Sequence, residues 1–178
     1  VQTEENLRLL SNAFLSFTPD PTGNIQILVN SLGEMLQASF CQYNKLSKDF
    51  LLTIASFNAP PHYSARKPAK GRVCTDVIRE KPDKIVLLKN FDSSKYAQHD
   101  PFIRKMGWKT CVSKNVALAG KSSGDVCLLF TTDYTLSSEE EELIGIISSA
   151  ISVQESLQHK IAQIRDREHK LQTLIDNS

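Results

Sequence analysis

The sequence predicts an α/β fold of the α+β kind. We expect a central antiparallel sheet of five to six strands, with N-terminal and C-terminal helices on one face and loops and short helices on the other. Residues 109–118 and 125–130 are largely apolar or small and flank a turn at 119–124, which indicates a central β-hairpin covered on both faces. Directly afterwards, Ser137 and Glu140 have the spacing of a capping box that opens a long helix.

The composition indicates one soluble domain with an appendage. The chain has 178 residues, of which 40% are hydrophobic and 23% charged, enough to bury a sizeable core. A formal net charge of +1, with Lys and Arg scattered singly, argues against nucleic acid as a partner. No apolar run reaches about 18 residues and no signal peptide is recognised, so direct membrane contact is not expected. Four widely spaced cysteines in apolar runs predict buried, reduced thiols and a cytoplasmic location: Cys41, Cys74, Cys111 and Cys127.

Two helices and a strand pair are predicted in the N-terminal part. The first helix starts near Thr3 and carries one apolar face, formed by Leu7, Leu10, Phe14 and Phe17. The second starts at the Asp20–Pro21 cap and carries the stripe Ile25, Leu28, Val29, Leu32 and Leu36. Residues 38–46 and 50–57 are expected to pair as antiparallel strands, because only the short polar turn 47–49 joins them.

The middle of the chain is predicted to supply the loop-rich cover. Residues 63–70 are basic and irregular, and residues 71–80 gather their apolar side chains on one helical face. A short strand at 85–88 and a polar loop at 90–99 follow. Asp100 and Pro101 then cap a short helix that Gly107 ends.

The last helix is predicted to run from about Ser138 to Ile175 and to pair with its copy in a parallel homodimer. From 143 to 175, ten positions alternate in steps of four and three, and eight of them are apolar. After Val153 only this narrow seam remains, which is typical of a coiled coil. The predicted dimer seam comprises Leu157, Ile161, Ile164 and Leu171. The alternative is a solvated linker helix that frays.

The element order and four segments resemble a GAF domain, the small-molecule sensor and dimerisation module of signalling proteins. The segments are residues 71–78, 84–92, 106–114 and 136–144. This resemblance implies the strand order 2-1-5-4-3 and a sensor domain over residues 1–156. Residues 167–178 resemble the start of a PAS domain, so residues 157–178 are expected to form a signalling helix that leads into it. Such an arrangement is similar to bacterial or archaeal sensor histidine kinases and cyclases, so downstream PAS and kinase or cyclase domains are expected partners within a two-component system.

The resemblance implies a ligand pocket between the sheet and its loop-rich cover. A mostly apolar cleft needs only a few polar groups to orient a ligand. Nine polar residues are expected there: Tyr43, Cys74, Asp76, Asn90, Asp92, Tyr96, His99, Asp100 and Lys114. Each of these residues has an alternative role that is purely structural. Asp and Asn commonly cap helices or form turns, and a cysteine can simply pack in the hydrophobic core. No cofactor is identified, and the expected ligand is an unknown small molecule.

Several known GAF ligands do not fit the sequence. Phytochrome-like GAF domains carry a Cys-His pair at this point, and the cysteine binds the bilin. Here His99 matches the histidine, but Gln98 replaces the cysteine, so a thioether-linked bilin is not expected. The motif of the cyclic-nucleotide members is not found. Haem would need a histidine in the pocket, whereas His99 is expected on a surface loop. The other histidines lie outside the expected pocket, so no metal site is expected.

The domain is expected to be a non-catalytic sensory input domain. No nucleophile has a base at a recognisable spacing, and no glycine-rich phosphate loop is found. An enzyme alternative arises because residues 71–74, Gly-Arg-Val-Cys, resemble a cysteine motif of free methionine-(R)-sulfoxide reductase. Residues 75–110, however, contain no resolving cysteine. A ligand-free dimerisation module is the third alternative.

Overall fold

The computed structural model describes residues 2–118 and 123–178, so most of the predicted hairpin turn lies outside the described residues. The described helices are α1 (Gln2–Leu15), α2 (Pro21–Met35), α3 (Val73–Glu80), α4 (Pro101–Lys105) and α5 (Ser138–Asp176), with 3-10 helices η1 (Phe91–Ser93) and η2 (Lys95–Gln98). The described strands are β1 (Phe40–Ser47), β2 (Phe50–Phe57), β3 (Arg66–Pro68), β4 (Val86–Leu88), β5 (Thr110–Ala117) and β6 (Ser123–Phe130).

The six described strands form one antiparallel sheet in the order β3-β2-β1-β6-β5-β4. The expected order 2-1-5-4-3 is confirmed, because those five strands correspond to β2, β1, β6, β5 and β4. The additional strand β3 lies in a segment that was predicted to be irregular. It pairs with only three residues of β2, at the sheet edge where a proline such as Pro68 is tolerated.

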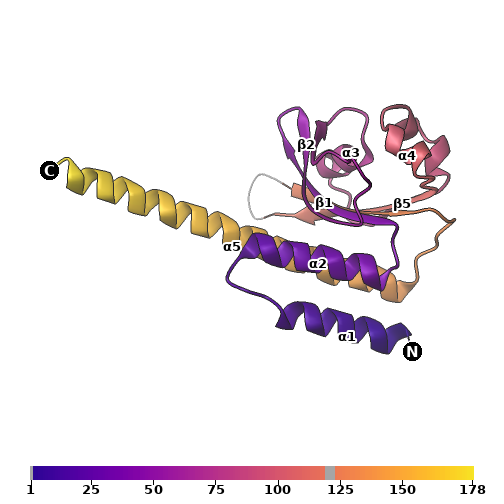
Figure 1. Cartoon of the computed structure of the whole chain (residues 1–178), viewed down its shortest axis with the longest axis horizontal. Helices are drawn as coiled ribbons and strands as arrows, with labels where there is room; N and C mark the ends of the chain where they lie inside the picture. The colour runs from indigo at the N-terminus through magenta and orange to yellow at the C-terminus, as the bar shows by residue number, and fades with distance from the viewer. Residues whose placement is uncertain (1, 119–122) are drawn as a thin grey trace.

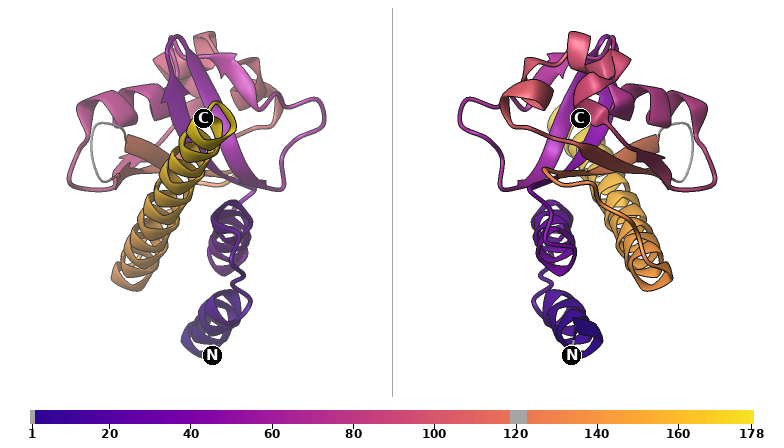
Figure 2. Two further views of the ribbon diagram at one scale, coloured as in Figure 1. Left: turned by 90° about the vertical axis from the view of Figure 1, so that its left-hand side faces the viewer. Right: turned by 90° about the vertical axis from the view of Figure 1, so that its right-hand side faces the viewer.

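Helices cover one face of the sheet and shorter elements cover the other, as predicted (Figure 1). Helices α2 and α5 lie side by side against the sheet, and α1 lies beyond α2 (Figure 2). Helices α3 and α4 lie on the opposite face with the 3-10 helices. None of the helices in the described ranges combines the length and the apolar character that a membrane span requires.

Alternating strand residues fill a separate core on each face of the sheet. In β1, Cys41 and Tyr43 pack on the helix side, whereas Phe40 packs under the loop-rich cover. The predicted central hairpin follows the same rule. Val112 and Val126 join the helix-side core, and Cys111 and Cys127 join the cover-side core. The prediction that all four cysteines are buried is confirmed, and their thiols are free.

The three capped helix starts predicted from the sequence are confirmed. The Asp20 side chain accepts a hydrogen bond from the Thr22 amide at the start of α2. Asp100 likewise accepts from the Phe102 amide at the start of α4, and Pro101 is the first residue of that helix. Ser137 and Glu140 form the predicted capping box of α5, in which each side chain accepts a hydrogen bond from the backbone of the other residue. Local sequence was sufficient here because a cap involves only neighbouring residues.

The apolar face predicted for the first helix is partly wrong. Leu7 and Phe14 are exposed, whereas Asn6 and Ala13 are buried against α2. The two remaining predicted residues, Leu10 and Phe17, are partly buried against the helix-side core. The helix is therefore rotated from the predicted face, so that Asn6 and Ala13 are covered in place of Leu7 and Phe14. Its exposed apolar residues remain without a described covering surface.

Helix α5 is as long as predicted and changes its environment halfway along. Its buried residues end at Gln154, whose side-chain oxygen accepts a hydrogen bond of 2.9 Å from the Asn24 amide of α2. Beyond that point the helix projects away from the rest of the chain (Figure 1). Leu157 is 42% exposed and Ile164 is 54% exposed. Three of the four predicted seam residues are therefore exposed in the single chain and Ile161 is half-buried, and dimerisation stays a prediction.

Candidate functional site

The candidate site is a pocket between the centre of the sheet and its loop-rich cover. Strands β1, β2 and β6 form its floor, and α3, α4, η1, η2 and the segment around β3 enclose it. Its lining residues are Gln42, Leu51, Tyr63, Lys67, Gly71, Arg72, Val73, Cys74, Phe91, Tyr96, Asp100, Ile103, Trp108, Cys127 and Leu129. The empty space is about 370 Å³ with its open mouth included, yet the side chains leave free room for only about one water molecule.

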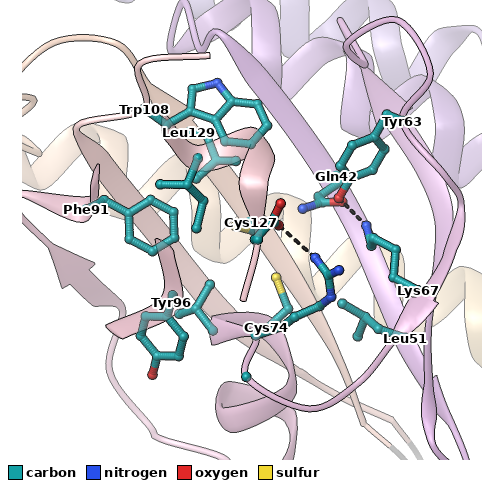
Figure 3. A pocket seen from close by; sticks show the side chains of 15 residues that line it. Gln42, Leu51, Tyr63, Lys67, Cys74, Phe91, Tyr96, Trp108, Cys127 and Leu129 are labelled. Atoms are coloured by element: carbon teal, nitrogen blue, oxygen red, sulfur yellow. Dashed lines mark hydrogen bonds and ion pairs between the residues drawn. The ribbon is translucent and has the colours of Figure 1, made fainter. Parts of the chain in front are cut away.

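One side of the pocket is an aromatic and aliphatic wall. Phe91, Tyr96 and Trp108 lie on this side, opposite Tyr63 and Lys67 (Figure 3). The Trp108 ring is buried and stacks on Phe40 with 5.5 Å between the ring centroids. This wall provides apolar surface for a ligand, and the polar groups face it from the other side.

The principal polar group is Lys67, which is only 6% exposed. Its ammonium group donates hydrogen bonds to the Tyr63 hydroxyl and to the Thr53 hydroxyl, the latter at 3.3 Å. The Tyr63 hydroxyl in turn donates to the side-chain oxygen of Gln42 at 2.8 Å. Among residues 2–118 and 123–178, no carboxylate forms an ion pair with Lys67. Burial lowers the pKa of Lys67 to about 8.

An ion pair closes the rim of the pocket. The Arg72 guanidinium lies 2.7 Å from the Asp100 carboxylate, and both side chains are largely buried. Arg72 precedes α3 and Asp100 caps α4, so this pair joins the starts of two helices across the pocket. Gly71, next to Arg72, has a φ of +76°, and a Cβ there would lie 2.4 Å from the His99 ring. A larger residue at position 71 would therefore displace the rim.

Below the pocket, buried thiols lie beside a buried carboxylate. The Cys74 and Cys127 sulfurs and an Asp125 oxygen all lie within 4.8 Å of one another. The Asn44 amide lies 3.5 Å from both the Cys74 sulfur and an Asp125 oxygen, and the Ser113 hydroxyl donates to the other Asp125 oxygen. The strand register explains why these side chains lie together. Asp125 of β6 pairs with Asn44 of β1, and α3, which carries Cys74, packs over both strands.

The protonation of this cluster reflects its burial. Burial raises the pKa of Asp125 to about 6, although hydrogen bonds from Cys74 and Ser113 oppose the shift. The Cys127 thiol and burial together raise the pKa of Cys74 well above its usual range. The Cys111 thiol, whose sulfur lies 3.6 Å away, and burial similarly raise the pKa of Cys127. Both thiols are therefore protonated near neutral pH and are weak nucleophiles in this state.

The structure brings three of the nine sequence-predicted residues into the pocket lining: Cys74, Tyr96 and Asp100. Asp76 lies beside them without lining the pocket, and its carboxylate accepts a hydrogen bond of 2.8 Å from the Tyr96 hydroxyl. Asp100 has both roles that were considered for it, because it caps α4 and also holds the rim through Arg72.

The structure places the other five predicted residues elsewhere. Tyr43 and Lys114 point to the helix side of the sheet, where Tyr43 is buried and Lys114 donates to the Asp83 carbonyl. The remaining three lie in the cover outside the lining. Asn90 is exposed in a left-handed turn before η1, Asp92 belongs to η1, and the exposed His99 lies against Gly71.

Sequence reasoning missed Gln42, Lys67 and Asp125. Lys67 was missed because it belongs to strand β3, which was not predicted. Asp125 was missed because it follows the hairpin turn, where an aspartate is usually interpreted as a turn residue. A signal was nevertheless present. Three polar residues occupy buried positions of otherwise apolar central strands: Gln42, Asn44 and Asp125. Burying a polar group costs free energy unless it finds a hydrogen-bonding or charged partner, so such residues indicate a site.

Comparison with known proteins identifies the fold. No protein-family model and no curated protein sequence matches this chain. Among solved structures, the GAF domain of Acinetobacter phosphoenolpyruvate-protein phosphotransferase is similar, with a TM-score of 0.65, 16% identity, and coverage of 90% of this chain and 95% of that one. The phycoerythrobilin-bound GAF domain of a cyanobacterial phytochrome gives a TM-score of 0.63, 15% identity, and coverage of 89% and 96%.

A third similar structure is an enzyme. Free methionine-R-sulfoxide reductase from Neisseria meningitidis, solved with its substrate, gives a TM-score of 0.68, 12% identity, and coverage of 90% of this chain and 91% of that one. Sequence identities this low establish the fold alone. The chain has the GAF-domain fold, as its sequence resemblance implied.

Proposed function

We propose that this chain is a non-catalytic sensory or regulatory input domain that binds a small molecule in the pocket and passes the signal on through α5. The observation that carries this proposal is Lys67, a buried lysine beside an apolar wall with no ion-pair partner among the described residues. A buried charge without a partner is costly. A ligand with an anionic or strongly accepting group and an apolar body would match both features.

Binding requires the pocket to open. Its free room holds about one water molecule, so a ligand must displace side chains or part the Arg72–Asp100 ion pair. That pair joins the starts of α3 and α4, so parting it would move the cover relative to the sheet. The proposed ligand-bound state is therefore a rearranged cover held by the ligand.

The sheet offers a direct mechanical connection to α5. Gln42 of β1 lines the pocket, and Lys45 of the same strand forms a 2.9 Å ion pair with Glu155 of α5. At the end of β5, the Ala117 carbonyl accepts a hydrogen bond from the Ser152 hydroxyl of α5. A shift of β1 or β5 on ligand binding would therefore be transmitted to the middle of α5, where the projecting half begins.

We further propose that the projecting half of α5 pairs with its copy in a homodimer and leads into downstream PAS and kinase or cyclase domains. A helix lying alone in water for this length would be marginally stable, and its apolar residues Leu157, Ile164 and Leu171 are exposed. Pairing would cover them. A dimer with no ligand is the alternative function, and the ligand experiment below separates the two.

Replacing Lys67 by methionine is expected to weaken binding of an anionic ligand about tenfold, because a hydrogen bond to a charged group is lost. A metabolite library is screened first by thermal unfolding. A compound present at about 100 times its dissociation constant should stabilise the chain by about 2.7 kcal/mol. The dissociation constant of the best anionic compound is then measured for each variant by calorimetry.

The matched control is Lys70→Met, which removes an exposed lysine three positions away. It should bind the same compound as the wild type does. Equal binding by wild type and Lys67→Met would remove the proposed role of Lys67. If no compound in the library shifts the unfolding temperature, the ligand-free dimerisation module becomes the better description.

No turnover of free methionine sulfoxide is expected from this chain, in contrast to the reductase that shares its fold. The structure does bring a second thiol, Cys127, close to Cys74, which the sequence did not anticipate. Both thiols have raised pKa values and are buried, however, so the thiolate population available for attack is small. Consumption of substrate with a dithiol reductant is measured at several enzyme concentrations. A rate proportional to enzyme and abolished in Cys74→Ser would contradict the non-catalytic proposal.

A further inference from the structure

We propose that Cys74, Cys127 and Asp125 bind one zinc ion at the floor of the pocket. The three side chains come from α3 and β6, and their candidate ligand atoms all lie within 4.8 Å of one another. Two thiolates and one carboxylate form a donor set that a borderline-soft divalent cation such as Zn²⁺ prefers. This proposal does not depend on the small-molecule ligand proposed above.

The spacing requires only a small adjustment. Zinc binds sulfur at about 2.3 Å and carboxylate oxygen at about 2.0–2.2 Å, so two sulfurs on one tetrahedral ion lie about 3.8 Å apart. Ligand atoms within 4.8 Å of one another reach this arrangement by movements of about 1 Å. Side-chain rotation of Cys74 on α3 can supply such a movement without changing the sheet.

The surroundings of the three side chains resemble those of a metal site. Metal ligands are usually held by hydrogen bonds from neighbouring groups. Here Asn44 lies 3.5 Å from both the Cys74 sulfur and an Asp125 oxygen, and Ser113 donates to the second Asp125 oxygen. These contacts keep the carboxylate and the Cys74 sulfur directed toward the same point.

The buried carboxylate also indicates a missing cation. Asp125 is fully buried, and within the described ranges no lysine, arginine or histidine forms an ion pair with it. Removing one charge from water without a counter-charge costs several kcal/mol. A zinc ion would provide that counter-charge.

Access and the fourth coordination position both come from the pocket. Cys74 and Cys127 contribute to the pocket lining, and the Cys74 sulfur points into it (Figure 3). An ion would enter by this route, since the strands and α3 enclose the other sides. Binding releases the two thiol protons to the solvent, so each sulfur coordinates as a thiolate. Three protein ligands leave one position for water or another ligand atom, as in open zinc sites.

The first test uses the wild-type chain alone. Reduced protein is stripped with a chelator and titrated with Co²⁺, which reports thiolate ligation by a charge-transfer band, and Zn²⁺ is then added to displace it. We expect one ion per chain. X-ray absorption of the zinc-loaded protein should show two sulfurs at about 2.3 Å with oxygen completing the shell. Absence of the thiolate band, or a shell of nitrogen and oxygen only, would overturn the proposal.

The second test locates the ion. The loss of a group that only hydrogen-bonds to a metal ligand typically weakens metal binding roughly 10- to 100-fold. Removal of a ligand itself should cost more, so zinc binding should fall by more than this in each of three variants: Cys74→Ser, Cys127→Ser and Asp125→Asn. The control is Cys41→Ser, since Cys41 is equally buried but packs on the helix side of the sheet. It should bind as the wild type does. Each variant is checked for its native circular dichroism. Unchanged binding in all three variants would assign the ion to surface histidines instead.

Discussion

Replacing Leu157, Ile161 and Ile164 together by glutamate is expected to convert a parallel dimer into a monomer. In the single chain Leu157 is 42% and Ile164 is 54% exposed, although they follow the coiled-coil spacing. Burying one large aliphatic side chain contributes about 1.5–3 kcal/mol, and the substitution removes three from each chain. Six glutamates would also repel one another across the seam. Light scattering of the wild type and the variant over a range of concentrations measures the change.

The control introduces the same charges away from the seam. His159, Ala162 and Gln163 lie on the outer side of the same turns and are exposed, so glutamate at these three positions should leave the dimer intact. The core of the domain ends at Gln154 along this helix, so neither triple variant should alter the unfolding of the sheet. A wild type that is monomeric at micromolar concentrations, or a seam variant that dimerises equally well, would show that the seam is wrong.

Replacing Lys67 by methionine is expected to remove a distinct pH dependence of stability. The pKa of Lys67 is about 8 in the folded chain, against an ordinary value of 10.5. Between these values the unfolded chain binds more protons than the folded chain, so stability rises with pH. This gain in the free energy of unfolding is complete above the pKa that Lys67 has in the unfolded chain. It is lost as the pH falls through the pKa that Lys67 has in the folded chain. The wild type should therefore gain about 2 kcal/mol more than Lys67→Met between about pH 7 and about pH 9.5.

Comparison of matched variants isolates this effect. The groups that influence Lys67 are Cys74, Arg72, Asp100 and Cys127, together with its hydrogen-bonding partner Tyr63, and all are present in both proteins. Loss of the hydrogen bonds to Tyr63 and Thr53 changes stability by an amount that depends little on pH. Lys70→Met, which removes an exposed charge, should retain the wild-type slope. Urea unfolding at a series of pH values measures the slopes, and parallel curves for wild type and Lys67→Met would refute the assignment.

Much of the fold could be predicted because its signals are local. Asp20, Asp100 and Ser137 cap helices through contacts with residues two or three positions away, so the chain itself carries these boundaries. The continuous apolar character of β5 and β6 likewise indicated strands buried on both faces. Strand β3 escaped prediction because its three residues pair only once β2 offers an open edge.

The candidate site was less predictable, since it depends on which face of the sheet each side chain occupies. Tyr43 was expected in the pocket and lies on the helix side, whereas its neighbour Gln42 lines the pocket. A shift of one residue reverses the face of every side chain in a strand, and β1 also has an irregularity between Tyr43 and Asn44. Periodicity therefore identified the strand without identifying the residues that face the ligand.

Apart from β3 and the 3-10 helices, the sequence by itself determined the order of the elements, the N-terminal caps of α2, α4 and α5, the length of α5 and the burial of all four cysteines, because each depends on local pattern and composition. Only the tertiary structure decided that Lys67 meets Tyr63 and that Cys74 meets Cys127 and Asp125. Cys74 and Cys127 are 53 positions apart in the sequence, Cys74 in helix α3 and Cys127 in strand β6. Their approach depends on strand register and on the placement of α3, which long-range packing sets and short sequence patterns do not encode.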